Sequence, residues 1–100
     1  MASYNISVTN AHTFVPPVQQ VKSGDTVTWV DTDPDPNSNP HTVTPDNANE
    51  IQGGSGDLNA AGDTFGPITI SGAPRTIAYY CAYHGAPGGV GMAGQLVVTA

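Results

Sequence analysis

The sequence predicts an all-β protein, a β-sandwich of about seven to eight short strands in one domain that covers residues 1–100. Runs of about five to seven residues rich in β-branched side chains are separated by Gly, Pro, Asn and Asp, which is the pattern of strands and turns. No segment of useful length repeats its apolar residues at the spacing of a helix. A chain of 100 residues has room for one hydrophobic core and one functional site.

The strands follow one another at short intervals along the chain. Val27 and Trp29 alternate with Thr26 and Thr28, as expected of a strand with one buried face. Residues 15–21 include two adjacent prolines, which lack amide donors, so we expect this segment at a sheet edge. The clearest strands are expected at residues 3–9, 25–30, 41–44, 64–70, 75–81 and 94–100.

Two long connections separate these strands. Residues 31–40, "DTDPDPNSNP", predict a turn-rich loop within the domain, because Asp, Asn and Pro favour turns. Residues 47–63 predict a second long loop, with room for no more than a turn of helix.

The charge balance limits the partners of the chain. Eight acidic residues outnumber Lys22 and Arg75, which gives a net charge of −6. Nucleic acids and anionic membranes are therefore poor partners, whereas a basic protein is a suitable one. No stretch approaches the ~20 apolar residues that cross a bilayer, so we expect no membrane insertion. We expect a monomer.

The chemistry-bearing residues gather near the C-terminus. Cys81, the only cysteine, is followed by His84 and then by Met92, so one loop can aim all three at a point. His41, at the start of another expected strand, is the best fourth member. This nitrogen and sulfur set suits copper that cycles between Cu(I) and Cu(II). Taken singly, a buried cysteine, a loop histidine and a methionine that fills the core are the plainer interpretations.

Four segments in order give the sequence a recognisable resemblance. "FVPPVQQVKSGDTVTWV", "PHTVT", "YYCAYH" and "GMAGQLVV" resemble the cupredoxins, the small blue copper proteins, and among them the plastocyanin-like branch. The resemblance implies a Greek-key β-sandwich with one type 1 copper. It also implies that His41, Cys81 and His84 are the close ligands and Met92 a weak axial one. The segment "GAPGGVG" before Met92 is longer than usual in that branch, and Thr42 stands where Asn is common.

Other residues receive plainer assignments. His12 has no partner at motif spacing and is expected to be a surface histidine. Trp29, Tyr79 and Tyr80 are expected to pack first, although Tyr80 matches a tyrosine on the partner-facing side of plastocyanins. The acidic side chains around the His41 strand form either a solvated surface or a docking patch: they are Asp31, Asp33, Asp35, Asp46 and Glu50.

These features favour a one-electron carrier over an enzyme, with redox proteins as partners and Ala86, Pro87 and Val90 as an apolar contact surface. The alternatives are small-molecule redox chemistry at an open type 1 copper and copper storage or delivery. A nitrite reductase or oxidase needs a second copper site, and a Cys–His hydrolase needs an orienting third residue. The resemblance implies an exported protein of the periplasm, thylakoid lumen or extracellular side, with no signal peptide in this chain.

Overall fold

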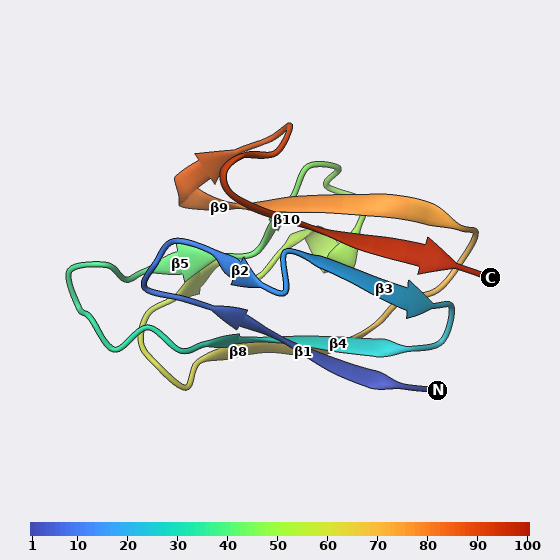
Figure 1. Ribbon diagram of the computed structural model, residues 1–100, viewed down its shortest axis with the longest axis horizontal. Coiled ribbons are helices and arrows are strands. Elements are labelled where there is room, and N and C mark those ends of the chain that lie inside the picture. The colour runs from blue at the N-terminus through green and yellow to red at the C-terminus, as the bar shows by residue number, and fades with distance from the viewer.

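Two four-stranded sheets form the body of the computed structural model, which describes residues 1–100 (Figure 1). The first sheet has the order β2-β1-β4-β8 and consists of β1 (Ser3–Val8), β2 (Phe14–Val15), β4 (Thr26–Asp31) and β8 (Thr64–Thr69). The second has the order β3-β10-β9-β6 and consists of β3 (Val18–Lys22), β6 (Thr44–Pro45), β9 (Arg75–Ala86) and β10 (Val90–Thr99). The predicted all-β sandwich is confirmed.

Strand pairing within the sheets is mixed. β1 runs parallel to β4 and β10 parallel to β3, whereas the remaining pairs are antiparallel. β3 pairs with β10 alone, so the expected edge strand is confirmed, although it begins after Pro16 and Pro17 rather than including them. The two prolines occupy the connection from β2, where no amide donor is needed; the carbonyl of Pro17 accepts the amide of Gln95 on β10.

The hydrophobic core lies between the sheets and reaches the end of the sandwich that carries His41. Val27 and Trp29 are fully buried while Thr26 and Thr28 are half-buried, which confirms the predicted alternation of β4. The ring of Tyr79 meets Trp29 edge-on at a centroid distance of 5.4 Å. Cys81 and Met92 belong to the same cluster of 17 buried residues. The core and the predicted ligands are therefore continuous.

The segment expected as one strand over residues 41–44 changes partner part-way. β5 (His41–Thr42) pairs with β7 (Asp57–Leu58), whereas β6 pairs with β9. Val43, between them, donates its amide to the hydroxyl of Ser55 at 2.8 Å instead of to a ladder partner. The turn of helix allowed within residues 47–63 is the 3₁₀-helix η1 (Ile51–Gly53). No helix has the length and apolar character needed to cross a membrane.

The largest difference from the sequence-based expectation is the hairpin of β9 and β10. The "GAPGGVG" segment, expected to be a loop, is mostly paired, with Val90 opposite Ala86 and Gly91 opposite Gly85. Glycines suggested a loop, but here Gly85 permits close approach of strands, because a Cβ on it would clash with the carbonyl oxygen of Met92. Figure 1 shows β9 and β10 running along the molecule, with the turn that joins them away from the two termini.

Candidate metal centre

Three donor side chains from two distant segments converge at this end of the sandwich. Nδ1 of His41, on β5, lies 3.8 Å from Sγ of Cys81, on β9. Nδ1 of His84, also on β9, lies 3.6 Å from the same sulfur. The donor atoms of the three residues all lie within 4.8 Å of one another. The predicted convergence of His41, Cys81 and His84 is confirmed as geometry.

A wide bulge in β9 makes this convergence possible. Tyr80 pairs with Ala93 and Gly85 with Gly91, so four residues of β9 lie opposite Met92 alone. In a regular strand, residues three apart point to opposite faces, but an irregularity of this kind redirects a side chain. Cys81 and His84 can therefore face the same point although they are three residues apart.

The spacing of the donors fits one metal ion. With bonds of about 2.3 Å to sulfur and about 2.0 Å to nitrogen, a trigonal arrangement separates sulfur from nitrogen by about 3.7 Å. The two observed separations, 3.8 and 3.6 Å, agree with this value. A trigonal set of two imidazoles and one thiolate is the donor set of a type 1 copper site. Met92, with 1% of its surface exposed, is buried on the strand opposite.

His41 is held by a carboxylate that lies behind it. Oδ2 of Asp33 is 2.8 Å from Nε2 of His41, and both side chains are fully buried. Because a carboxylate only accepts, Nε2 carries the proton and donates it, which leaves the lone pair of Nδ1 directed toward Cys81. Burial alone raises the pKa of Asp33, but hydrogen bonds from Ser38, His41 and the Asp35 amide outweigh it and lower the pKa to about 2. The carboxylate is therefore charged at neutral pH.

Thr42 connects the two segments that supply the ligands. Its amide donates to Sγ of Cys81 at 3.4 Å, and its hydroxyl accepts the amide of Ala82 at 2.8 Å. The residue that distinguishes this chain from the common Asn thus ties β5 to β9 directly beside the sulfur. Hydrogen bonds around a coordinating sulfur tune the metal that it binds.

Solved structures share this arrangement of strands over nearly the whole chain. A purple cupredoxin from Nitrosopumilus maritimus superposes with a TM-score of 0.70 at 27% identity, over 95% of this chain and 98% of that one. The fold is that of a cupredoxin. An oxidised amicyanin with a Met-to-Leu substitution superposes with a TM-score of 0.70 at 23% identity, over 95% of this chain and 80% of the amicyanin. A Cu(I) amicyanin with a Met-to-Ala substitution superposes with a TM-score of 0.71 at 24% identity, over 97% of this chain and 82% of the amicyanin.

At those identities the two amicyanins are evidence for the fold alone. No protein-family model matches the sequence, and no curated protein matches it.

His12 lies beside the donor cluster of this cupredoxin fold, although the sequence assigned it only to the surface. It is exposed, as expected, but its ring stacks on that of His84 with a centroid distance of 3.8 Å and an interplanar angle of 21°. Its ring also meets His41 edge-on at 6.0 Å. No motif spacing links residues so far apart in the sequence, so only the folded chain reveals the contact.

His84 itself is half-buried and lies on β9, not on the flexible loop that its neighbouring glycines suggested. Burial, and then the proximity of His12 and His41, lower the pKa of His84. A lower pKa favours the neutral imidazole, which is the form that binds a metal.

Two of the acidic residues assigned to a surface or docking patch are buried. Asp33 is fully buried behind His41, and only 1% of Asp31 is exposed. The alternation of Asp and Asn in residues 31–39 has a local cause, because successive side chains accept amides two residues ahead. The backbone amide of Asp33 donates to the carboxylate of Asp31, that of Asp35 to Asp33 and that of Asn37 to Asp35. The predicted turn-rich loop is thus a series of Asx turns.

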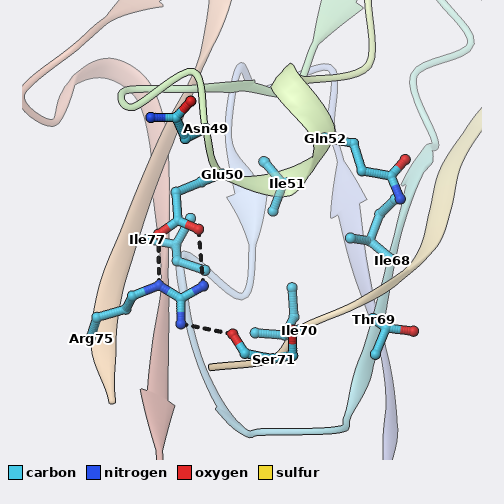
Figure 2. Close-up of a pocket in the computed structure, with 10 residues that line it drawn as sticks. All are labelled: Asn49, Glu50, Ile51, Gln52, Ile68, Thr69, Ile70, Ser71, Arg75 and Ile77. Carbon is cyan, nitrogen blue, oxygen red and sulfur yellow. Dashed lines mark hydrogen bonds and ion pairs between the residues drawn. The ribbon is translucent and has the colours of Figure 1, made fainter. Parts of the chain in front are cut away.

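A pocket between η1 and β8 lies apart from the donor cluster (Figure 2). Glu50 and Arg75 form one side of it and are joined by two hydrogen bonds, of 2.7 and 2.9 Å. None of the three donors lines this pocket. Its polar wall is an ion pair whose two partners bind each other, and the donor cluster remains the candidate functional site.

Proposed function

We propose that this chain is a one-electron transfer protein that holds a single type 1 copper through His41, Cys81 and His84, with Met92 as a weak axial ligand. The observation that carries the proposal is the buried convergence of two imidazole nitrogens and one sulfur within 4.8 Å. When bound, copper supplies the Cu(I)/Cu(II) couple, which exchanges one electron. A carrier needs no substrate cleft and no proton donor.

The protein's own contribution is to fix the donors. Asp33 orients His41, the amide of Thr42 holds the sulfur of Cys81, and β9 carries both Cys81 and His84. Ligands that keep the same positions in both oxidation states of the metal keep the reorganisation energy of electron transfer small. All three histidines of the chain gather at this one cluster, which favours a carrier over an enzyme with a second copper site.

Absorption spectroscopy after addition of one equivalent of Cu(II) tests the proposal. The parent chain should develop an intense visible band from thiolate-to-copper charge transfer. Cys81→Ser should lose this band because the thiolate is gone. Met92→Leu is the matched control: it should keep the band, because the three close ligands remain, and its reduction potential should rise because a donor to Cu(II) is lost.

A Cys81→Ser protein that kept the band would refute the ligand assignment. An unchanged spectrum and potential in Met92→Leu would instead show that the sulfur of Met92 lies too far away to act as a ligand.

We also propose that the partner is a redox protein with a basic docking surface and that the chain works outside the cytoplasm. The net charge of −6 supports the first part. The resemblance to exported blue copper proteins supports the second.

A further inference from the structure

The two imidazole ligands are anchored in different ways. His41 donates from Nε2 to the buried carboxylate of Asp33, the usual means by which a protein orients a metal-binding imidazole. The ring of His84 contacts Cys81 from Nδ1, but its Nε2 has no hydrogen-bond partner in the protein. The more exposed ligand therefore lacks the anchor that the buried one has.

The ring of His12 contacts His84 in a different way, by stacking on the face of its ring. It lies nearly parallel to the ring of His84 at 3.8 Å, close enough for van der Waals contact across the whole ring. Nε2 of His12 is 3.2 Å from the hydroxyl of Ser38, on the loop that leads to His41. A hydrogen bond to the loop before His41 thus holds the stacking ring.

The backbone of the β1–β2 connection supports the same arrangement. The amide of Thr9 donates to the carbonyl of Thr13, and their hydroxyls hydrogen-bond at 2.7 Å. His12 has a φ of +58°, a conformation that side-chain-bearing residues adopt infrequently. This turn directs the ring toward the ligand cluster.

We propose that His12 is a positioning residue for the metal ligand His84, whose ring it holds by stacking in the orientation that directs Nδ1 toward Cys81. The role rests on the proposed metal centre but acts before any metal arrives. It is a property of the folded chain, because the stacked pair and its support by Ser38 involve protein atoms alone.

The test compares His12→Ala with His12→Phe, which restores an aromatic ring without its nitrogens. Both replacements carry a Cβ and adopt the same backbone at φ +58°, so the difference between them isolates the ring. All three proteins are measured at one pH, about 8, which is above the ordinary histidine pKa of about 6.5. Circular dichroism verifies that each variant folds.

The first readout is NMR of the metal-free proteins labelled at histidine. In the parent, the ring protons of His84 should show contacts to His12 and the shift produced by a stacked ring. In His12→Ala these protons should move toward the positions of a freely rotating side chain, and in His12→Phe they should stay close to the ring-stacked positions. A His84 signal unchanged in His12→Ala overturns the proposal, as does a His12→Phe protein indistinguishable from His12→Ala.

The second readout is Cu(I) affinity, measured by competition with a chromogenic chelator. Freeing one side chain that binding must fix again should weaken affinity by about twofold to tenfold in His12→Ala, with recovery in His12→Phe. Equal affinities in all three proteins would also overturn the role. Failure of the parent chain to bind copper at all would refute the proposed function and leave the NMR comparison to decide the role of His12.

Discussion

Asp33 determines how one ligand of the centre is presented. Its carboxylate is buried with His41 at 2.8 Å, and its pKa of about 2 keeps it charged at any pH near neutrality. The fixed negative charge stands one imidazole ring away from the position where the donors converge. A charge of that sign stabilises the more positive oxidation state of a bound metal. Asp33 should therefore lower the reduction potential of the centre.

Asp33→Asn should raise the reduction potential of the copper-loaded protein. The amide oxygen can still accept from Nε2 of His41, whereas the NH2 group that replaces the other oxygen gives up the bond from the Asp35 amide. The orientation of His41 and the visible band should therefore be retained while the charge is lost. We expect a rise on the order of 60 mV, which is a tenfold change in a one-electron equilibrium. Voltammetry measures it, with Asp35→Asn as the control, because Asp35 is an exposed carboxylate two residues away. Equal potentials in Asp33→Asn and the parent would contradict the electrostatic role.

Among the elements, the β9–β10 hairpin combines two tasks. It carries Cys81, His84 and Met92, and it pairs on both sides of the bulge that turns Cys81 and His84 to one face. The start of β9, at the other end of the hairpin, is held by Arg75, whose guanidinium donates to the carboxylate of Glu50, the residue that precedes η1. Figure 2 shows the carboxylate and the guanidinium facing each other in direct contact at one side of the pocket. The ion pair thus joins the start of β9 to the long loop that follows β6.

Glu50→Gln should remove an acid-sensitive part of the stability. Hydrogen bonds from Arg75 lower the pKa of Glu50 below 4.5 despite its partial burial. A lowered pKa stabilises the fold above pH 4.5, and this stability is lost as the pH falls through the folded-state pKa. At pH 7 the free energy of unfolding of the variant should be lower than that of the parent by at most about 1 kcal/mol, because the ion pair is partly exposed and solvent screens it.

Urea unfolding of the metal-free proteins at a series of pH values checks this expectation. The difference between parent and Glu50→Gln should be largest above about pH 5 and should shrink toward zero in acid. The variant serves as its own control for the other carboxyl groups, since these titrate in both proteins. A difference that stayed constant from neutral to acid pH would exclude the ion pair as its source.

At the scale of the whole molecule, the net charge of −6 governs long-range encounter. Three of the eight acidic side chains, Asp25, Asp31 and Asp33, are buried, so they contribute to the field without contacting a partner. Exposed carboxylates lie on several separate segments: Asp35, Asp46 and Asp63 on connections and Asp57 on β7. Attraction to a basic partner should therefore act through the overall field more than through one patch.

Electron transfer from the reduced protein to a cationic cytochrome should slow as salt is added. Screening shortens the range of the field to ~10 Å at 0.1 M ionic strength, and steering can change association rates by about tenfold or more. Stopped-flow measurement across a range of sodium chloride concentrations checks this prediction. An anionic cytochrome is the control and should react faster as salt rises. A rate to the cationic partner that is flat or rising with salt would rule out steering.

The sequence by itself determined the fold class and the chemistry of the donors. Alternation in Thr26–Asp31 predicts which side chains of β4 are buried, because a strand places successive residues on opposite faces. The donor set follows from residue type alone: one thiol, two imidazoles and a thioether are soft ligands wherever they meet. These properties are local, so periodicity and composition suffice to read them.

Only the tertiary structure decided which residues contact and orient those donor side chains. Asp33 resembled a surface carboxylate and His12 a surface histidine, yet one is buried behind His41 and the other stacks on His84. The sequence did not predict the hairpin, because glycines that indicate a loop also permit the close approach of strands, as at Gly85. Each of these outcomes depends on contact between segments far apart in the chain, and the free energy of such contacts is absent from any local pattern.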